Sequence, residues 1–271
     1  MIKQLEFVYC IDKNYNKQAF LSIASLLDNI EIGKPVVNII HKSPRSFNKF
    51  RNKLSNLYPN LEINLFKFKY KIKNFPNLKN SHVSEATYYR IFIANHINSK
   101  SKFVIYLDAD AFIVSNPIKE LNSAIKELQS KNLLLAAKTT DYFQKQESLD
   151  IFQRLNMNDK YFNAGVLVIN MEYWIKNNIS QKLQDRVWEI KEDIVYWDQD
   201  VLNSFVNGKY VELADSLNCI INIEEKIDES KTKIIHYVGK QKPWGGEGFK
   251  KNPDTYYQHL HKKYFKNKPD A

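Results

Sequence analysis

The chain has 271 residues, 44% of them hydrophobic and 26% charged, a balance that excludes a disordered, collagen-like or coiled-coil protein. Its net charge of +10 comes from 40 basic and 30 acidic residues, and nearly all the basic residues are lysine. A dedicated nucleic-acid binder relies more on arginine, so we expect no nucleic-acid partner. The charge then indicates either a lysine-rich surface or an attraction to phosphate, on a nucleotide or at a membrane face.

The sequence also argues against a membrane-spanning or secreted protein. The longest apolar runs, 133–137 and 164–169, are far shorter than the roughly 20 residues of a membrane helix. The first residues lack the apolar stretch of a signal peptide. Two cysteines, Cys10 and Cys219, carry no sign of being paired. We therefore expect a cytoplasmic localisation.

The first half of the chain alternates short apolar runs with helical periodicity. In chain order, the predicted elements are a strand at 5–10, a helix at 15–27, a strand at 36–40, a helix at 47–57, a strand at 61–65, a helix that follows Ser84 and extends to 95, and a strand at 103–107. This alternation is typical of a parallel sheet covered by helices on both faces.

The second half continues the pattern less regularly. The predicted elements are a helix from 117 to 130, strands at 133–137 and 166–170, helices at 182–191 and 199–206, and short strands near 210 and 234. The whole pattern predicts an α/β fold with a Rossmann-like, mostly parallel sheet flanked by helices. We expect one domain over residues 1–248 and a basic, aromatic tail over 249–271.

Two aspartates follow the strand at 103–107 directly. Asp108 and Asp110 are two residues apart, so in extended backbone their carboxylates project to the same side. The carboxyl edge of a parallel strand is where open α/β sheets bind ligands, and paired carboxylates suit Mg²⁺ or Mn²⁺. A solvated loop or a helix cap is the alternative for this tripeptide.

A second polar group follows the short strand near 234. His236 is a suitable third ligand for Mn²⁺ and suits Mg²⁺ less well. Gly239 would let the backbone approach a phosphate, and Lys242 could neutralise a diphosphate oxygen. The alternatives are a half-buried structural histidine and one more surface lysine.

Two further segments carry polar residues beside apolar ones. Asn163 precedes a small pair and a buried strand, where a turn residue is the alternative. Asp198 and Asp200 stand on either side of Gln199 at the start of a predicted helix, where N-terminal capping is the alternative.

Taken together, these segments resemble the family 8 glycosyltransferases, which are retaining enzymes of the GT-A fold. The resemblance runs from Phe7 to Trp244. Its motifs are Asp12-Lys13-Asn14-Tyr15, Thr87-Tyr88-Tyr89-Arg90, Leu107-Asp108-Ala109-Asp110, Phe162-Asn163-Ala164-Gly165, Asp198-Gln199-Asp200, and His236-Tyr237-Val238-Gly239 with Lys242-Pro243-Trp244. Lys13 replaces an acid that is common in close bacterial relatives.

The resemblance implies a metal site and a nucleotide site. Asp108, Asp110 and His236 would hold Mn²⁺, with Mg²⁺ as the alternative ion, and Ala109 is the variable middle residue of the acid motif. The turn after the first strand would bind the nucleotide of a UDP-sugar. There Asp12 and Asn14 would contact uracil and ribose, and Tyr15 would stack near the base.

The resemblance also implies contacts to the donor sugar and the diphosphate. Arg90 and Asp141 would hold the sugar, with Arg90 also near the diphosphate. Asn163 and Asp198 would contact sugar hydroxyls, and Asp198 is also the candidate nucleophile of a covalent route, although we favour attack from the leaving-group face. Gln199 would be the catalytic residue beside the anomeric carbon. Gly239 and Lys242 would bind the diphosphate.

The implied function is transfer of a hexose, galactose or glucose, from a UDP-sugar to a glycan or lipid-linked glycan acceptor, as in lipopolysaccharide or other surface-glycan synthesis. Alternatives are a non-catalytic UDP-sugar-binding homologue and an enzyme that acts on a glycosylated protein. In the tail, tyrosine and phenylalanine among lysines favour peripheral contact with an anionic membrane, and a frayed basic terminus is the alternative.

Overall fold

The structure is a computed structural model. It describes residues 5–72, 74–76, 84–97, 101–140, 151–158, 160–222, 225, 227–228, 230–245, 252 and 254–265.

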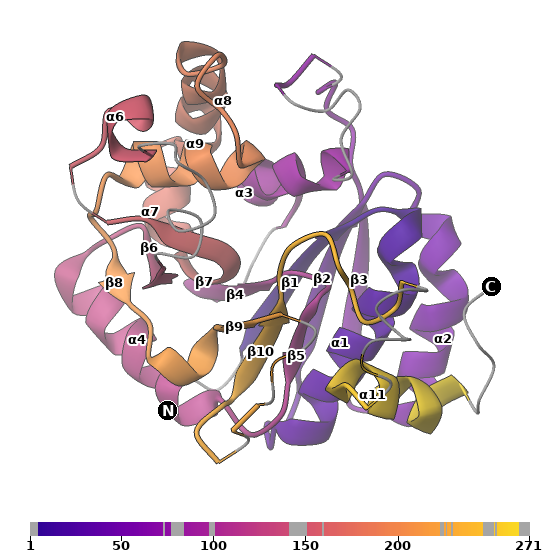
Figure 1. Cartoon of the computed structure of the whole chain (residues 1–271). Helices are drawn as coiled ribbons and strands as arrows, with labels where there is room; N and C mark the ends of the chain where they lie inside the picture. Colours follow the sequence, from indigo (N-terminus) through magenta and orange to yellow (C-terminus); the bar gives the residue numbers. More distant parts are fainter. Residues whose placement is uncertain are drawn as a thin grey trace.

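The main sheet has seven strands in the order β3-β2-β1-β4-β7-β6-β8 (Figure 1). These strands are β1 (Glu6–Ile11), β2 (Val36–His41), β3 (Glu62–Lys67), β4 (Phe103–Leu107), β6 (Leu135–Thr139), β7 (Phe162–Asn170) and β8 (Val211–Glu212). β7 runs antiparallel to both neighbours, whereas the other pairs are parallel. The predicted α/β fold with a mostly parallel sheet is confirmed.

Helices cover both faces of this sheet. The helical elements are η1 (Lys13–Tyr15), α1 (Asn16–Asn29), η2 (Pro44–Phe47), α2 (Asn48–Leu57), η3 (Glu85–Phe92), α3 (Ile93–His96), α4 (Ile118–Lys131), α6 (Ile151–Leu155), α7 (Met171–Lys176), α8 (Ile179–Glu189), α9 (Trp197–Val206), η4 (Asp215–Leu217) and α11 (Tyr256–Phe265). Among the described residues, no helix combines the length and the apolar character needed to cross a membrane.

Side-chain alternation along β1 separates two hydrophobic cores. Phe7, Tyr9 and Ile11 belong to a core shared with α1, α2 and α4. Val8 and Cys10 belong to a second core shared with η3, α8 and α9. Since successive residues of a strand point to opposite faces, the apolar β4 and the largely apolar β1, in which Glu6 is the one charged residue, are buried on both sides, as the short apolar runs predict.

A second, three-stranded sheet brings distant parts of the chain together. It has the order β5-β10-β9, formed by β5 (Ala111–Ile113), β10 (Ile234–Tyr237) and β9 (Cys219–Ile221). β5 begins directly after Asp110 and pairs antiparallel with β10, so that Ala111 lies opposite His236. This register is the reason that the histidine reaches the two aspartates.

The C-terminal helix α11 packs on the protein core beside α1 and α2 (Figure 1). The Phe265 ring lies 5.2 Å from that of Phe20 and 6.4 Å from that of Phe50, measured between centroids. Tyr264 shares a 2.7 Å hydrogen bond with the hydroxyl of Tyr58. The last turn of this helix is therefore anchored, not frayed, and the division of the chain at 248/249 stays a prediction.

Candidate active site

A cavity of about 880 Å³ opens at the carboxyl ends of β1 and β4. Its walls contain most of the residues that the sequence singled out. These are Asp12, Tyr15, Arg90, Asp108, Ala109, Asp110, Asp198, Gln199, His236, Gly239 and Lys242. The location agrees with the rule that open α/β sheets bind ligands beyond the carboxyl ends of their strands.

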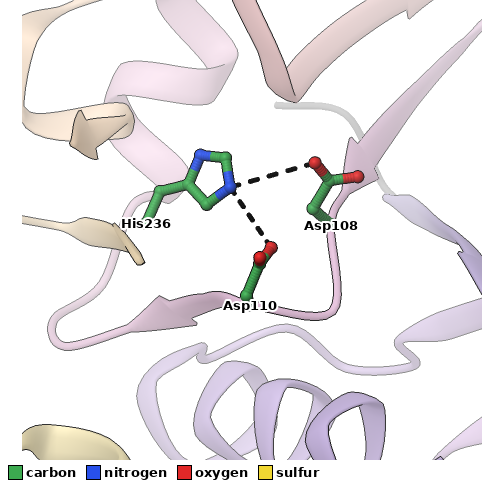
Figure 2. A group of neighbouring side chains, drawn as sticks. All are labelled: Asp108, Asp110 and His236. Atoms are coloured by element: carbon green, nitrogen blue, oxygen red, sulfur yellow. Dashed lines mark ion pairs between the residues drawn. The ribbon is translucent and has the colours of Figure 1, made fainter. Parts of the chain in front are cut away.

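Asp108, Asp110 and His236 converge at one point of this cavity (Figure 2). His236 Nε2 lies 3.2 Å from Asp110 Oδ1 and 3.9 Å from Asp108 Oδ2. One ligand atom from each residue lies within 4.8 Å of the others. Two carboxylates and an imidazole form a donor set that suits a divalent ion such as Mn²⁺.

The orientation of the His236 ring supports this fit. Its Nδ1 lies 3.1 Å from Asn163 Oδ1 and 3.2 Å from Asn218 Oδ1. Both neighbours are hydrogen-bond acceptors, so Nδ1 carries the proton and Nε2 presents its lone pair toward the carboxylates. A metal-binding histidine is commonly held in this way by an oxygen acceptor on its second nitrogen.

Gly165 makes room for the imidazole. It lies within β7, and a Cβ at this position would stand 2.1 Å from Cε1 of His236. The Gly165 carbonyl accepts a 2.8 Å hydrogen bond from the Asp108 amide, which extends the pairing between β4 and β7. Glycine in a strand interior marks a close approach, and here the approaching group is the histidine.

Lys242 neutralises the side of Asp110 that faces away from His236. Its Nζ donates a 2.7 Å hydrogen bond to Asp110 Oδ2 and a 2.5 Å hydrogen bond to the Tyr237 carbonyl. Burial would raise the pKa of Asp110, but the neighbouring Lys242 ammonium opposes it, and that pKa lies well below its ordinary value. Asp110 is therefore an ionised carboxylate at neutral pH.

Arg90 joins the acid motif to the start of α9. Its Nη2 lies 2.9 Å from Asp108 Oδ1, and its Nε lies 2.5 Å from Asp198 Oδ2, an ion pair without hydrogen-bond geometry. The guanidinium also stacks over the Tyr106 ring, with 4.3 Å between Cζ and the centroid. Arg90 is 5% exposed and Asp198 is 1% exposed.

The carboxyl group of Asp198 is unusually basic. Burial raises its pKa to about 6, against the opposing effects of Arg90 and of the hydrogen bond donated by Thr87. The capping alternative fits Asp200 instead, since its Oδ2 accepts hydrogen bonds from the Val195 and Tyr196 amides just before the helix, at 2.8 Å each.

The other predicted contact residues lie in different settings. Asp12 Oδ1 accepts a 2.8 Å hydrogen bond from the Asn14 amide, and Asn14 is exposed and lies outside the cavity wall. Tyr15 stands in the wall and makes an edge contact with Trp244, with 6.1 Å between ring centroids. Gly239 has φ 79°, a left-handed conformation that favours glycine. The nucleotide contacts of these residues stay predictions.

Asn163 lies behind the cavity wall. It is 3% exposed, and its Oδ1 accepts hydrogen bonds of 2.9 Å from both the Gly165 amide and Asn218 Nδ2. Its predicted contact with a sugar hydroxyl stays a prediction, while the structure gives it the task of positioning His236. Asp141 lies outside the described residues.

Several residues of the site carry no marked signal in the sequence. Asn218 lies in the segment before β9, and no motif surrounds it. Tyr106 donates a 2.6 Å hydrogen bond to Asp108 Oδ1, and its spacing of two from that residue could have indicated a shared face. Tyr196 and Trp197 line the cavity as well.

Comparison with known proteins agrees with this geometry. A family model described as glycosyl transferase family 8 matches residues 6–248. General stress protein A of Bacillus subtilis is 26% identical over 94% of this chain and 93% of its own length. A lipopolysaccharide 1,3-galactosyltransferase of Salmonella typhimurium is 31% identical over 66% of this chain and 54% of its own length.

Solved structures show the same fold. The galactosyltransferase LgtC, crystallised with donor and acceptor sugar analogues, superposes with a TM-score of 0.76 over 96% of this chain and 95% of its own, at 22% identity. A structure of an LgtC active-site mutant gives a TM-score of 0.77 over 96% of both chains, also at 22% identity. The predicted GT-A fold is thus confirmed, and since the family model covers nearly the whole chain, the protein belongs to glycosyltransferase family 8.

Proposed function

We propose that this glycosyltransferase transfers a hexose, galactose or glucose, from a UDP-sugar to a glycan or lipid-linked glycan with retention of the anomeric configuration. The observation that carries the proposal is the convergence of Asp108, Asp110 and His236 in a cavity that also contains Lys242 and Gln199. Lipopolysaccharide glycosyltransferases among the relatives support a surface glycan as the product.

The acid and histidine side chains would hold the divalent ion, for which Mn²⁺ is the better fit and Mg²⁺ the alternative. When bound, such an ion supplies positive charge that stabilises phosphate oxygens.

Lys242 supports departure of UDP from the anomeric carbon. Negative charge grows on the diphosphate as the glycosidic bond breaks, and a fixed ammonium group stabilises that charge most at this stage. Lys242 is held in place by Asp110 and the Tyr237 carbonyl. Gly239, with its left-handed backbone, lies on the same wall and lets the main chain approach the phosphates.

The carboxylates near the anomeric carbon favour attack from the leaving-group face over a covalent intermediate. Asp198 Oδ1 accepts a hydrogen bond from Thr87, and its Oδ2 pairs with Arg90. Asp200 is fully buried and bonded through both oxygens. Gln199 is a poor nucleophile because an amide oxygen is nearly non-basic. We infer that the leaving phosphate takes the proton of the acceptor hydroxyl.

A panel of UDP-sugars tests the proposal. The protein with Mn²⁺ is incubated with UDP-galactose, UDP-glucose and other UDP-sugars, and UDP release is measured with and without glycan acceptors. We expect slow release from one hexose donor and faster release with the correct acceptor. Thermal stabilisation by UDP-sugars without UDP release would favour the non-catalytic alternative. A glycosyl adduct trapped on Asp198 would contradict attack from the leaving-group face.

The cytoplasmic localisation and the membrane contact of the tail stay predictions. In α11, Tyr264 and Phe265 face the core, and Lys263 pairs with Asp28 at 2.8 Å. Membrane attraction from this helix would therefore rest on exposed cations such as Lys262, not on these partly buried rings. Co-sedimentation of the full chain and of Lys262→Glu with anionic vesicles measures that contribution.

A further inference from the structure

The side chain of Gln199 is held at both ends of its carboxamide. At one end, Oε1 accepts hydrogen bonds from the Ala164 amide at 3.0 Å and from Asn163 Nδ2 at 3.4 Å. At the other end, Nε2 donates a 3.0 Å hydrogen bond to the hydroxyl oxygen of Tyr161. Ala164 and Gln199 both line the cavity, so the amide oxygen is the end that lies beside the wall residue Ala164.

The hydroxyl of Tyr161 has a fixed direction. It donates a 2.6 Å hydrogen bond to Asp200 Oδ1. A phenol has a single proton, so the Tyr161 oxygen can only accept from Gln199. Burial, with Asp200 next to it, raises the pKa of Tyr161 well above its ordinary value, and the phenol therefore keeps its proton.

Asp200 in turn is fixed as an acceptor. It is fully buried, and its second oxygen, Oδ2, accepts hydrogen bonds from Arg154 Nη1 at 2.9 Å and from the amides of Val195 and Tyr196 at 2.8 Å. Three donors on one oxygen leave Oδ1 for Tyr161. The direction of each hydrogen bond in the chain Asp200–Tyr161–Gln199 thus follows from the one before it.

We propose that Tyr161 and Asp200 are positioning residues that set which end of the Gln199 carboxamide faces the donor sugar. This inference rests on the proposed function, in which Gln199 lies beside the anomeric carbon. Because Oε1 is held at the Ala164 end and Ala164 lines the cavity, the negative end of the amide dipole would be the end nearer to the positive charge that develops on the sugar ring. A reversed amide would present hydrogen atoms there instead.

Asp200→Asn should reverse the direction of the hydrogen bonds from residue 200 through Tyr161 to Gln199, while the side chain at position 200 keeps its size and shape. The new amide oxygen keeps the Arg154, Val195 and Tyr196 donors, which places the new NH₂ group against Tyr161. Tyr161 then accepts from residue 200 and donates to residue 199. Gln199 would have to turn its oxygen toward Tyr161 and its NH₂ toward the Ala164 N–H, a clash of donors.

We expect Asp200→Asn and Tyr161→Phe each to lower kcat for UDP release from the active one of UDP-galactose and UDP-glucose by about tenfold or more, with KM and Mn²⁺ affinity within about twofold. Gln199→Glu is also impaired, because the carboxylate that it introduces finds no donor in Tyr161. The double variant Gln199→Glu with Asp200→Asn should recover activity relative to Gln199→Glu alone, since Tyr161 can then donate to that carboxylate. Tyr58→Phe removes a hydroxyl bonded to Asp28 and Tyr264, none of which lines the cavity, and serves as the matched control.

A second measurement reads the chain without turnover. In ¹H–¹⁵N spectra, the Gln199 side-chain NH₂ signal is assigned by its absence in Gln199→Glu, and it should shift in Tyr161→Phe and Asp200→Asn but not in Tyr58→Phe. The inference would be overturned by unchanged NH₂ shifts in Tyr161→Phe and Asp200→Asn. It would also be overturned if these two variants changed kcat and KM by equal factors and the double variant showed no recovery of activity. Absence of UDP release by the wild-type protein from either donor contradicts the proposed function alone, and the NH₂ signal still decides the positioning roles.

Discussion

Replacing Gly165 by alanine should displace His236, a proposed metal ligand, without changing the identity of that residue. The new Cβ would stand 2.1, 2.6 and 2.8 Å from Cε1, Nδ1 and Nε2 of His236. Since carbon atoms pack at about 3.5–4.0 Å, the ring must retreat by roughly 1.5 Å. The β7 backbone has little freedom to move instead, because Gly165 is bonded through its amide to Asn163 and through its carbonyl to Asp108.

This displacement has two measurable costs. In the wild-type protein, His236 Nδ1 lies 3.1 Å from Asn163 Oδ1 and 3.2 Å from Asn218 Oδ1. A displacement of the ring by roughly 1.5 Å would break both hydrogen bonds. Loss of such outer support lowers metal affinity about 10–100-fold. Overpacking lowers the free energy of unfolding by about 1–3 kcal/mol, and each kcal/mol lowers Tm by about 2–4 °C in a chain of this size.

Mn²⁺ titration followed by electron paramagnetic resonance, together with thermal melts, tests Gly165→Ala. Gly33→Ala is the matched control, because a Cβ at Gly33 meets nothing within 4 Å, and it should match the wild type in both measurements. Mn²⁺ affinity of Gly165→Ala within twofold of the wild type, at an unchanged Tm, would refute the reasoning.

Three further predictions concern Asp198, Arg90 and α11. Because burial raises the pKa of Asp198 from 3.8 to about 6, kcat/KM should rise with pH through about 6 as Asp198 ionises beside Arg90. The free energy of unfolding should instead fall between about pH 4 and 6, where the folded state binds one more proton than the unfolded state. A pH profile of Asp198→Asn that keeps the same inflection would contradict this assignment. The lysine of Arg90→Lys cannot reach both carboxylates and the Tyr106 ring, so this variant should raise KM for the UDP-sugar and lower the free energy of unfolding by about 1–3 kcal/mol. An unchanged KM would argue against a donor-binding role of Arg90. Phe265→Ala should lower the free energy of unfolding, measured in urea, by about 1–3 kcal/mol because the Phe265 ring packs on Phe20. Phe265→Leu, which keeps a large apolar side chain, should be closer to the wild type. Equal stability of all three proteins would show that α11 does not stabilise the core.

The regular, fully buried strands were predictable from the sequence. The apolar run at 103–107 coincides with β4, and the run at 36–40 falls one residue short of β2. Such strands are covered on both faces, so their apolar character needs no partner to be recognised. The direction of β7 was not predictable in the same way, because an apolar strand looks alike whether its neighbours are parallel or antiparallel.

The residues that bring the site together were harder to predict. β5 has only three residues and β9 has three, so neither shows a period of its own, yet their pairing with β10 delivers His236. Asn218 is invisible for the same reason, since its role depends on a contact with a residue 18 positions away. The chemistry of Asp108, Asp110 and His236 followed from residue type, spacing and family resemblance, whereas the hydrogen bonds that orient them follow only from the fold.

The most direct test of the account is anomalous X-ray diffraction from crystals soaked with Mn²⁺ and UDP. We predict a single strong anomalous peak per chain bounded by the carboxylates of Asp108 and Asp110 and by Nε2 of His236, with the UDP phosphates beside it and Lys242. A peak bound away from the His236 ring, or UDP bound outside the cavity at the ends of β1 and β4, would contradict the account.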